Sequence, residues 1–322
     1  MKIVVMIPAY NEEQAIGDVI RGIPRDCAEE VEVLIIDDGS TDNTVEVSHR
    51  AGADKVISHT DNKGLGIAFR TGLTTALKMG ADIIVNIDAD GQFNPGDIPR
   101  LIKPIIEGEA DMVTCSRFLD KGMIPKMPWI KKFGNNIVTK IVNFLTKQNY
   151  TDTQCGFRAY SKDAALKLTI FSGYTYTQEV FLDLINKNCI IKEIPCKVKG
   201  ERNGKSRIVN NFLSYGVKVL IILIRTFRDN KPLEFFGSIG FITFSIGFVS
   251  GLFLIIRWFL YHVVSPYRSL VSLSALLLML GFLLLFLALI ADMSDRQRKI
   301  LEEILYRLRK NELSSRSDGN ER

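Results

Sequence analysis

Short apolar runs separated by polar clusters organise the first half of the chain. The runs at 3–7, 33–36 and 83–87 have the length and composition of buried strands. Each run ends in a polar cluster and is followed by a segment with helix-like spacing. This alternation predicts βαβ units around a mostly parallel sheet. Because ligands of open α/β sheets bind beyond the carboxyl ends of the strands, we expect the polar clusters to line a binding site.

Two much longer apolar runs, 235–260 and 270–291, dominate the last third of the chain. Each is long enough to cross a hydrocarbon layer of about 30 Å as a helix. Buried helices of a soluble core are the alternative, but the rest of the chain leaves no partner surface to cover them. The connection at 261–269 is short, so we predict a transmembrane hairpin whose two outer ends lie on one side of the bilayer.

Basic residues gather at those outer ends, namely Arg225, Arg228 and Lys231 before the hairpin and Arg296, Lys299 and Lys310 after it. The hairpin loop carries only Arg268, together with His262. Lys and Arg are enriched on the cytoplasmic side of membrane proteins. We therefore expect a cell-membrane protein with two spans, whose large amino-terminal part and carboxyl-terminal tail are both cytoplasmic.

The stretch Asp88-Ala89-Asp90-Gly91-Gln92 is the most informative polar cluster. Two carboxylates one residue apart at the end of a buried strand can share a hard divalent cation. A cation held there can bridge and neutralise phosphate oxygens. A solvated acidic turn explains this stretch equally well when it is taken alone.

The glycine pattern bears on which nucleotide chemistry is expected. Gly64-Leu65-Gly66 is followed by Ile67-Ala68-Phe69, so the third glycine of the dinucleotide fingerprint is missing. A hydride-transfer domain is therefore disfavoured.

Four clusters taken together resemble a known family. They are Pro8-Ala9-Tyr10-Asn11-Glu12-Glu13, Asp37-Asp38-Gly39-Ser40-Thr41-Asp42, Asn62-Lys63-Gly64-Leu65-Gly66 and Asp88-Ala89-Asp90-Gly91-Gln92. This order is similar to that of family 2 glycosyltransferases, and most similar to the branch of dolichyl-phosphate mannosyltransferases and polyprenyl-phosphate glycosyltransferases. The resemblance covers residues 1 to about 230 and implies the α/β GT-A fold of nucleotide-diphospho-sugar transferases, with a mostly parallel sheet flanked by helices.

With this resemblance, we expect four parts in the chain. They are a cytoplasmic GT-A catalytic domain at 1–207, a juxtamembrane interfacial helix region at 208–233, two transmembrane helices within 234–292, and a basic amphipathic tail at 293–322. A third packed core helix remains the alternative for the juxtamembrane region. The tail suits docking either on a neighbouring subunit, as in a homo-oligomer, or on the membrane.

The resemblance also implies a donor site. It places Asp90 and Gln92 as metal ligands, with Asp88 facing the metal and the nucleotide, and the metal is Mg²⁺ or Mn²⁺. The implied contacts to the nucleotide-sugar are Pro8, Tyr10, Asn11, Glu12, Asp38, Gly64, Asp88, Ala89, Asp90 and Gln92. The competing role for Asp38 is turn formation with Gly39 and Ser40.

An acceptor site is implied as well. Arg117 follows the apolar run 112–114, and Arg202 lies shortly before the juxtamembrane region. In the lipid-phosphate branch, arginines at such places hold the acceptor phosphate, which a guanidinium can bind with two hydrogen bonds. Lys131 and Lys205 are further candidates, although the family often has arginine at the first position and the second could equally contact anionic lipid.

Asp152, in a segment that resembles the family's Asp…Cys-Gly-Phe-Arg, is expected near the acceptor. A lipid monophosphate is largely ionised at neutral pH, since its second pKa is about 6. Its oxygen needs positioning more than deprotonation. We therefore expect Asp152 to orient the acceptor or to assist weakly, not to act as an obligate base.

Composition narrows the partners. The net charge of +5 is modest, and the basic residues lie near the membrane and acceptor segments, which favours anionic lipid over nucleic acid. The chain has five cysteines without a Cys-x-x-Cys spacing, and in a reducing cytoplasm these are expected to be free thiols. None of the three histidines pairs with a cysteine, so a zinc site is not expected.

The sequence therefore predicts metal-dependent, inverting transfer of a sugar from a nucleotide-sugar to dolichyl or polyprenyl phosphate at the cytoplasmic membrane face. The main alternative is a membrane-anchored family 2 enzyme with a saccharide or protein acceptor. A processive polysaccharide synthase is disfavoured, because Arg257-Trp258 is preceded by Leu254 where the Gln-x-x-Arg-Trp element needs glutamine. The intact acidic pair argues against a non-catalytic scaffold.

Overall fold

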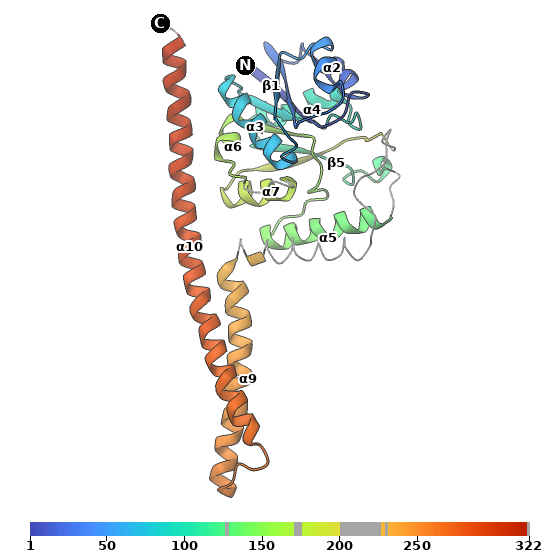
Figure 1. The fold of residues 1–322 in the computed structure, drawn as a ribbon. Helices are drawn as coiled ribbons and strands as arrows, with labels where there is room; N and C mark the ends of the chain where they lie inside the picture. The colour runs from blue at the N-terminus through green and yellow to red at the C-terminus, as the bar shows by residue number, and fades with distance from the viewer. Residues whose placement is uncertain (126–128, 171–175, 200–226, 229–230, 321–322) are drawn as a thin grey trace. The chain divides into compact units, whose positions relative to one another are not determined.

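The computed structural model describes residues 1–125, 129–170, 176–199, 227–228 and 231–320 (Figure 1). Two compact units divide the chain, one formed by Met1–Phe212 with Ile304–Arg322 and the other by Leu213–Glu303. Most of the predicted juxtamembrane region, 208–226, lies outside the described residues.

A seven-stranded sheet forms the centre of the first unit, with the order β3-β2-β1-β4-β6-β5-β7. The strands are β1 (Lys2–Ala9), β2 (Glu30–Asp37), β3 (Lys55–Ser58), β4 (Ile83–Asn86), β5 (Met112–Ser116), β6 (Arg158–Ser161) and β7 (Ile191–Pro195). Neighbouring strands pair in parallel except around β6, which runs antiparallel to both β4 and β5. The prediction of a mostly parallel α/β sheet is confirmed.

Most of the helices of this unit lie before residue 200 in the sequence (Figure 1). They are α1 (Ile16–Arg21), α2 (Thr44–Arg50), α3 (Leu65–Lys78), α4 (Ile98–Ile106), α5 (Trp129–Thr146), α6 (Lys162–Lys167) and α7 (Thr177–Asn186), with 3₁₀ turns η1 (Pro95–Asp97) and η2 (Lys121–Met123).

Strand β1 shows how the sequence builds two cores. Its odd-numbered residues Ile3, Val5 and Ile7 join a cluster with α1 and α4, while Val4 and Met6 join another with α3, α6 and α7. Successive side chains of a strand point to opposite faces, so an unbroken apolar run is what a strand covered on both faces requires. Full burial of one such side chain contributes about 1.5–3 kcal/mol.

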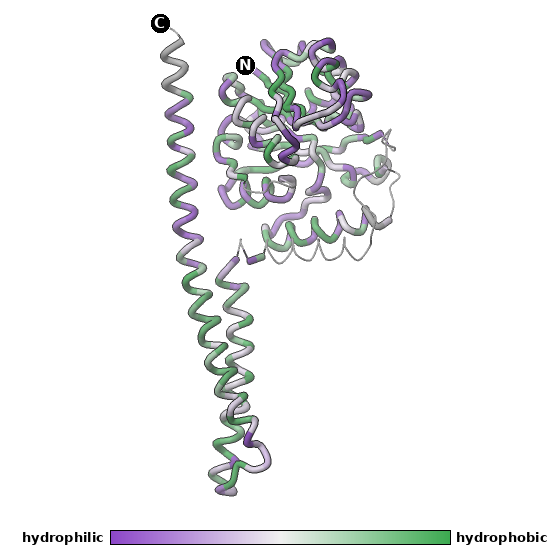
Figure 2. Tube along the Cα trace, in the orientation of Figure 1, coloured by the Kyte–Doolittle hydropathy of each residue, from purple (hydrophilic) through white to green (hydrophobic). Residues whose placement is uncertain are grey.

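The second unit contains α9 (Pro232–Tyr261) and the first part of α10 (Arg268–Asn320). Both helices are long and apolar enough to cross a membrane. Figure 2 shows their apolar character, and most of their apolar side chains are exposed, unlike those of a soluble core helix. The prediction of two apolar C-terminal helices that could span a membrane is confirmed.

Glycines bring these two helices close together. A Cβ atom on Gly247 would lie 2.7 Å from the backbone nitrogen of Leu278, and one on Gly281 would lie 2.5 Å from that of Phe244. Gly240 is equally restricted, at 2.9 Å from the backbone nitrogen of Leu285. Small residues at such positions are what allow helix backbones to approach closely in a membrane.

Helix α10 continues past the predicted span to Asn320, so the expected tail is the end of one long helix. From Ile304 onward it belongs to the first unit. Tyr306 donates a hydrogen bond to Asp163 (2.6 Å), and Arg309 donates to the carbonyl oxygens of Leu166 (3.2 Å) and Leu168 (2.8 Å). The tail thus packs against the first unit of its own chain, a contact that the sequence did not predict.

Candidate active site

The loops that follow β1 and β2 are joined by hydrogen bonds. Asn11 accepts a bond from the Thr41 backbone N–H on its Oδ1 (2.8 Å) and donates its own N–H to Ser40 Oγ (2.9 Å). The backbone N–H of Glu12 donates to Thr44 Oγ1 (2.9 Å). Asn11 has a φ of 55°, a left-handed conformation that asparagine tolerates better than most residues. The first two sequence motifs are therefore side by side.

Asp38 joins the third motif to the second. Its buried carboxylate accepts hydrogen bonds from the backbone N–H groups of Lys63 (3.1 Å) and Gly64 (2.8 Å) and lies 2.7 Å from His59 Nδ1. Gly64 precedes α3 with a φ of 94°, which a residue with a Cβ rarely adopts. Asp38 therefore joins the loop after β2 to the loop before α3.

The acidic pair follows β4, and β4 runs parallel to β1. The Asp88–Gln92 segment therefore leaves the sheet at the same edge as Pro8 and Tyr10. Asp90 accepts a hydrogen bond from the Gln92 backbone N–H on its Oδ1 (3.1 Å), and Ala89 is buried in the core beneath the loop. All four sequence motifs meet along one edge of the sheet.

Gly156 lies directly against Asp88. A Cβ atom at position 156 would be 2.7 Å from Asp88 Oδ1 and 2.8 Å from Oδ2, so any other residue would displace this carboxylate. Asn86 holds Gly156 close to Asp88. Its Nδ2 donates hydrogen bonds to the Gly156 carbonyl (2.7 Å) and to Tyr176 Oη (2.9 Å). The segment that begins at Asp152 thus forms a wall beside the acidic pair.

Asp152 is fully buried and pairs with Arg117. The Arg117 Nε lies 2.6 Å from Asp152 Oδ2, and Nη2 lies 2.9 Å from Oδ1. Burial alone would lower the pKa of Arg117, but the hydrogen bonds and the charge of Asp152 outweigh it, so the pKa lies above its usual value. Two residues that the sequence assigned to the acceptor site are brought together as an ion pair.

Glu193 holds the backbone beside this ion pair. Its carboxylate accepts hydrogen bonds from the backbone N–H groups of Thr151 (2.8 Å) and Asp152 (2.8 Å). Burial raises the pKa of Glu193, although these bonds act in the opposite direction. The backbone that carries Asp152 is therefore fixed by a second acid on β7.

The cysteine prediction is wrong for one pair. Cys115 and Cys196 form a disulfide with a Cα–Cα distance of 5.5 Å, while Cys27, Cys155 and Cys189 are free. The expectation rested on the compartment and on the missing Cys-x-x-Cys spacing. It did not foresee that β5 and β7 are neighbouring parallel strands, which brings their carboxyl ends together.

The structure gives no side-chain position for the remaining acceptor candidates. Lys131 falls in α5, and the position of its side chain is not described. Arg202 and Lys205 lie outside the described residues.

Sequence reasoning missed His59, Asn86 and Arg158. Arg158 is fully buried on β6, donates to the Thr153 carbonyl (3.0 Å) and lies over the Phe181 ring at 4.8 Å. Asn86 interrupts an otherwise apolar run, and this polar residue in a buried strand was the signal available for it. Buried polar groups of this kind need hydrogen-bond partners. Asn86 and Arg158 both find one in a backbone carbonyl between Asp152 and Gly156.

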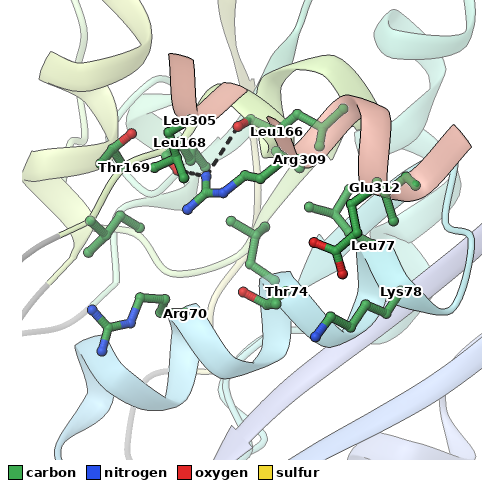
Figure 3. Close-up of a pocket in the computed structure, with 14 residues that line it drawn as sticks. Arg70, Thr74, Leu77, Lys78, Leu166, Leu168, Thr169, Leu305, Arg309 and Glu312 are labelled. Atoms are coloured by element: carbon green, nitrogen blue, oxygen red, sulfur yellow. Dashed lines mark hydrogen bonds between the residues drawn. The ribbon is translucent and has the colours of Figure 1, made fainter. Parts of the chain in front are cut away.

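A cavity of about 260 Å³ lies elsewhere in the first unit, between α3, residues 165–170 and the tail part of α10 (Figure 3). Its walls include Leu73, Leu77, Leu166, Leu168, Leu305 and Leu313. No predicted site residue lines it. The cavity belongs to the contact between the tail and the catalytic unit and not to the acidic edge.

The donor set at the acidic edge fits a hard divalent cation only in part. Asp88, Asp90 and Gln92 offer carboxylate and amide oxygens, yet within the described ranges no three His, Cys, Asp or Glu residues surround one point. Mg²⁺ is often held by one or two carboxylates, with substrate phosphate oxygens completing its shell. The residues thus fit a cation that is bound together with a phosphorylated substrate.

Comparison with known proteins decides the family. Residues 4–169 match the family described as glycosyl transferase family 2. The chain belongs to this family. A UDP-N-acetylglucosamine–dolichyl-phosphate N-acetylglucosaminyltransferase from Methanococcus voltae is 32% identical over 242 residues, which cover 69% of this chain and 96% of the relative. The glycosyltransferase AglJ of Haloferax volcanii is 28% identical over 308 residues, covering 93% and 97%.

A solved structure agrees with the fold. Glucosyl-3-phosphoglycerate synthase from Mycobacterium tuberculosis matches with a TM-score of 0.54 at 22% identity, covering 70% of this chain and 79% of that one. This family 2 glycosyltransferase therefore has the GT-A fold, as the resemblance implied.

Proposed function

We propose that this enzyme transfers a sugar from a nucleotide-sugar to dolichyl or polyprenyl phosphate at the cytoplasmic face of the membrane. The observation that carries the proposal is the meeting of four motifs at one sheet edge, in a chain that also has an apolar hairpin long enough to span a bilayer. The dolichyl-phosphate activity named for the Methanococcus relative supports the lipid acceptor. The positive-inside pattern supports the cytoplasmic face.

The nucleotide-sugar would bind at the edge of the sheet where the four motifs meet. Pro8, Tyr10, Asn11, Glu12, Asp38 and Gly64 would surround the nucleoside, directly or through their loops, and Ala89 would support the loop beneath it. Asp88, Asp90 and Gln92 would hold Mg²⁺ or Mn²⁺. Such a cation, when bound, neutralises charge on the departing diphosphate.

The acceptor phosphate would attack the anomeric carbon directly, and this single displacement inverts the configuration. The structure supports a positioning role for Asp152, because Oδ1 and Oδ2 both accept hydrogen bonds from Arg117. Arg117, fixed in this way, would face the acceptor phosphate with Arg202, Lys131 and Lys205. Since the phosphate is already largely ionised, orientation is the main task of these residues.

The test uses the full chain in detergent or vesicles with polyprenyl phosphate, Mn²⁺ or Mg²⁺, and a panel of uridine and guanosine diphosphate sugars. Mass spectrometry should detect a lipid-phosphate-linked sugar. Asp90→Ala should abolish it, whereas Glu107→Ala, at the exposed end of α4, should not. Full turnover by Asp90→Ala would overturn the metal role, and transfer to saccharide or protein but never to lipid would overturn the acceptor.

A further inference from the structure

His59 connects three segments of the proposed nucleotide-sugar site. It directly follows β3, and its backbone N–H donates to the Asp37 carbonyl (2.8 Å). Its ring lies between Asp38, with Nδ1 2.7 Å from Oδ1, and Thr71 of α3, with Nε2 3.1 Å from Oγ1. The side chain is only 10% exposed. The imidazole therefore bridges the loop after β2 and helix α3.

Both ring nitrogens of His59 take part in hydrogen bonds. An ionised carboxylate only accepts, so Nδ1 must carry the hydrogen that it shares with Asp38. Nε2 and Thr71 Oγ1 share the second hydrogen bond of the ring, in which the hydroxyl can either donate or accept. In this arrangement Thr71, on α3, orients the imidazole, and the imidazole orients the Asp38 carboxylate.

Asp38 uses the same carboxylate to hold the loop before α3. The N–H groups of Lys63 and Gly64 both donate to it. Backbone packing restricts this loop as well, since a Cβ atom on Gly39 would lie 2.6 Å from the carbonyl carbon of Asp61. A rotation of Asp38 would release the two N–H groups, while the loop around Gly39 has no spare space to absorb the change.

We propose that His59 is a positioning residue for the donor nucleotide. It keeps the Asp38 carboxylate directed at Lys63 and Gly64, and the 62–66 loop thereby stays in the conformation that meets the nucleotide. This inference rests on the proposed function, because it names what prepares the same donor site. His59 would act on the nucleotide only through Asp38.

Four variants of the full-length enzyme test the proposal. His59→Phe keeps the ring shape without polar atoms, His59→Asn restores a donor near the position of Nδ1, and Thr71→Val removes the hydroxyl. His49→Phe is the matched control, because His49 is exposed on α2. Thermal unfolding of each variant verifies that it folds.

Loss of a hydrogen bond to a charged group predicts about a tenfold rise in donor KM for His59→Phe. The kcat and the acceptor KM should change less than about twofold, Thr71→Val should show a smaller rise in donor KM, and His59→Asn should recover most of the loss. An unchanged donor KM in His59→Phe, or equal losses in donor KM and acceptor KM, would overturn the proposal.

Calorimetric binding of UDP and GDP with Mn²⁺ separates this inference from the function beneath it. A wild-type protein that binds neither nucleotide would overturn both proposals. A wild-type protein that binds one of them, together with a His59→Phe variant of equal affinity, would overturn the role of His59 alone. Weaker binding by His59→Phe with recovery in His59→Asn supports it.

Discussion

Arg117 and Asp152 form a two-point ion pair in which Nε and Nη2 of the guanidinium lie 2.6 and 2.9 Å from the two carboxylate oxygens. The Asp152 side chain is fully buried, and that of Arg117 is 22% exposed. A pair of this geometry fixes the plane of the guanidinium, which an isolated arginine would not maintain. Asp152 therefore holds in place the guanidinium that we propose binds the acceptor phosphate.

Replacement of one residue of the Arg117–Asp152 pair should lower the unfolding free energy more than replacement of both. Asp152→Ala leaves a largely buried guanidinium without its counter-charge, and we expect a loss of about 2–4 kcal/mol in unfolding free energy. Arg117→Met in the same chain removes that unpaired charge, so the double variant should unfold at a higher temperature than Asp152→Ala alone. Thermal unfolding in detergent measures both effects, and strictly additive losses would argue against a coupled pair.

Glu193 should make stability depend on pH. Because burial raises its pKa in the folded state above the ordinary 4.5, the native protein binds this proton more tightly than the unfolded chain. Its contribution to stability is therefore lost as the pH rises from about 4.5 through the raised pKa. Glu193→Gln cannot titrate, so its melting temperature should fall less across this window than that of the wild type. Identical profiles for the two proteins would contradict the burial effect.

The disulfide predicts a thiol count. The unfolded wild-type chain should react with three equivalents of a thiol reagent before reduction and with five afterwards, since the cysteines outside the Cys115–Cys196 bond are free. Replacement of both residues by alanine should lower the unfolding free energy by about 2–5 kcal/mol. Five reactive thiols in unreduced protein would show that the bond does not form.

The tail should stabilise the catalytic unit. Arg309→Met deprives the carbonyl oxygens of Leu166 and Leu168 of a donor, and we expect a fall of roughly 2–6 °C in melting temperature. Leu308→Ala is the control, because Leu308 is 61% exposed on the same helix. Equal melting temperatures for both variants would mean that the Arg309 contact contributes nothing.

The sequence predicted those parts of the fold that depend on local pattern. The runs that became β1, β2 and β4 were recognisable because an unbroken apolar stretch between polar clusters has few other uses in a soluble domain. The same reasoning placed the acidic pair at a strand end. It also located α9 and the span within α10, since length and hydropathy suffice for such helices.

Relationships between distant residues could not be predicted in this way. The insertion of antiparallel β6 between β4 and β5 is a choice of sheet order, which no local pattern records. The Cys115–Cys196 bond follows from that order, because it pairs β5 with β7. The contact of Tyr306 with Asp163 likewise joins segments that are separated by almost half the chain. Asp38 was expected to contact the nucleotide-sugar or to form a turn, but its contact with His59 was not anticipated.

The glycines at 240, 247 and 281 have a consequence for how the anchor assembles. Inside a bilayer, apolar side chains are already out of water, so the hydrophobic effect does not pair the helices. Their association relies on close approach of the two backbones. In a bilayer, α9 and α10 would therefore associate through this close backbone contact. A leucine at any one of these three sites would place side-chain atoms where the backbone of the other helix now lies, so the two helices would have to move apart.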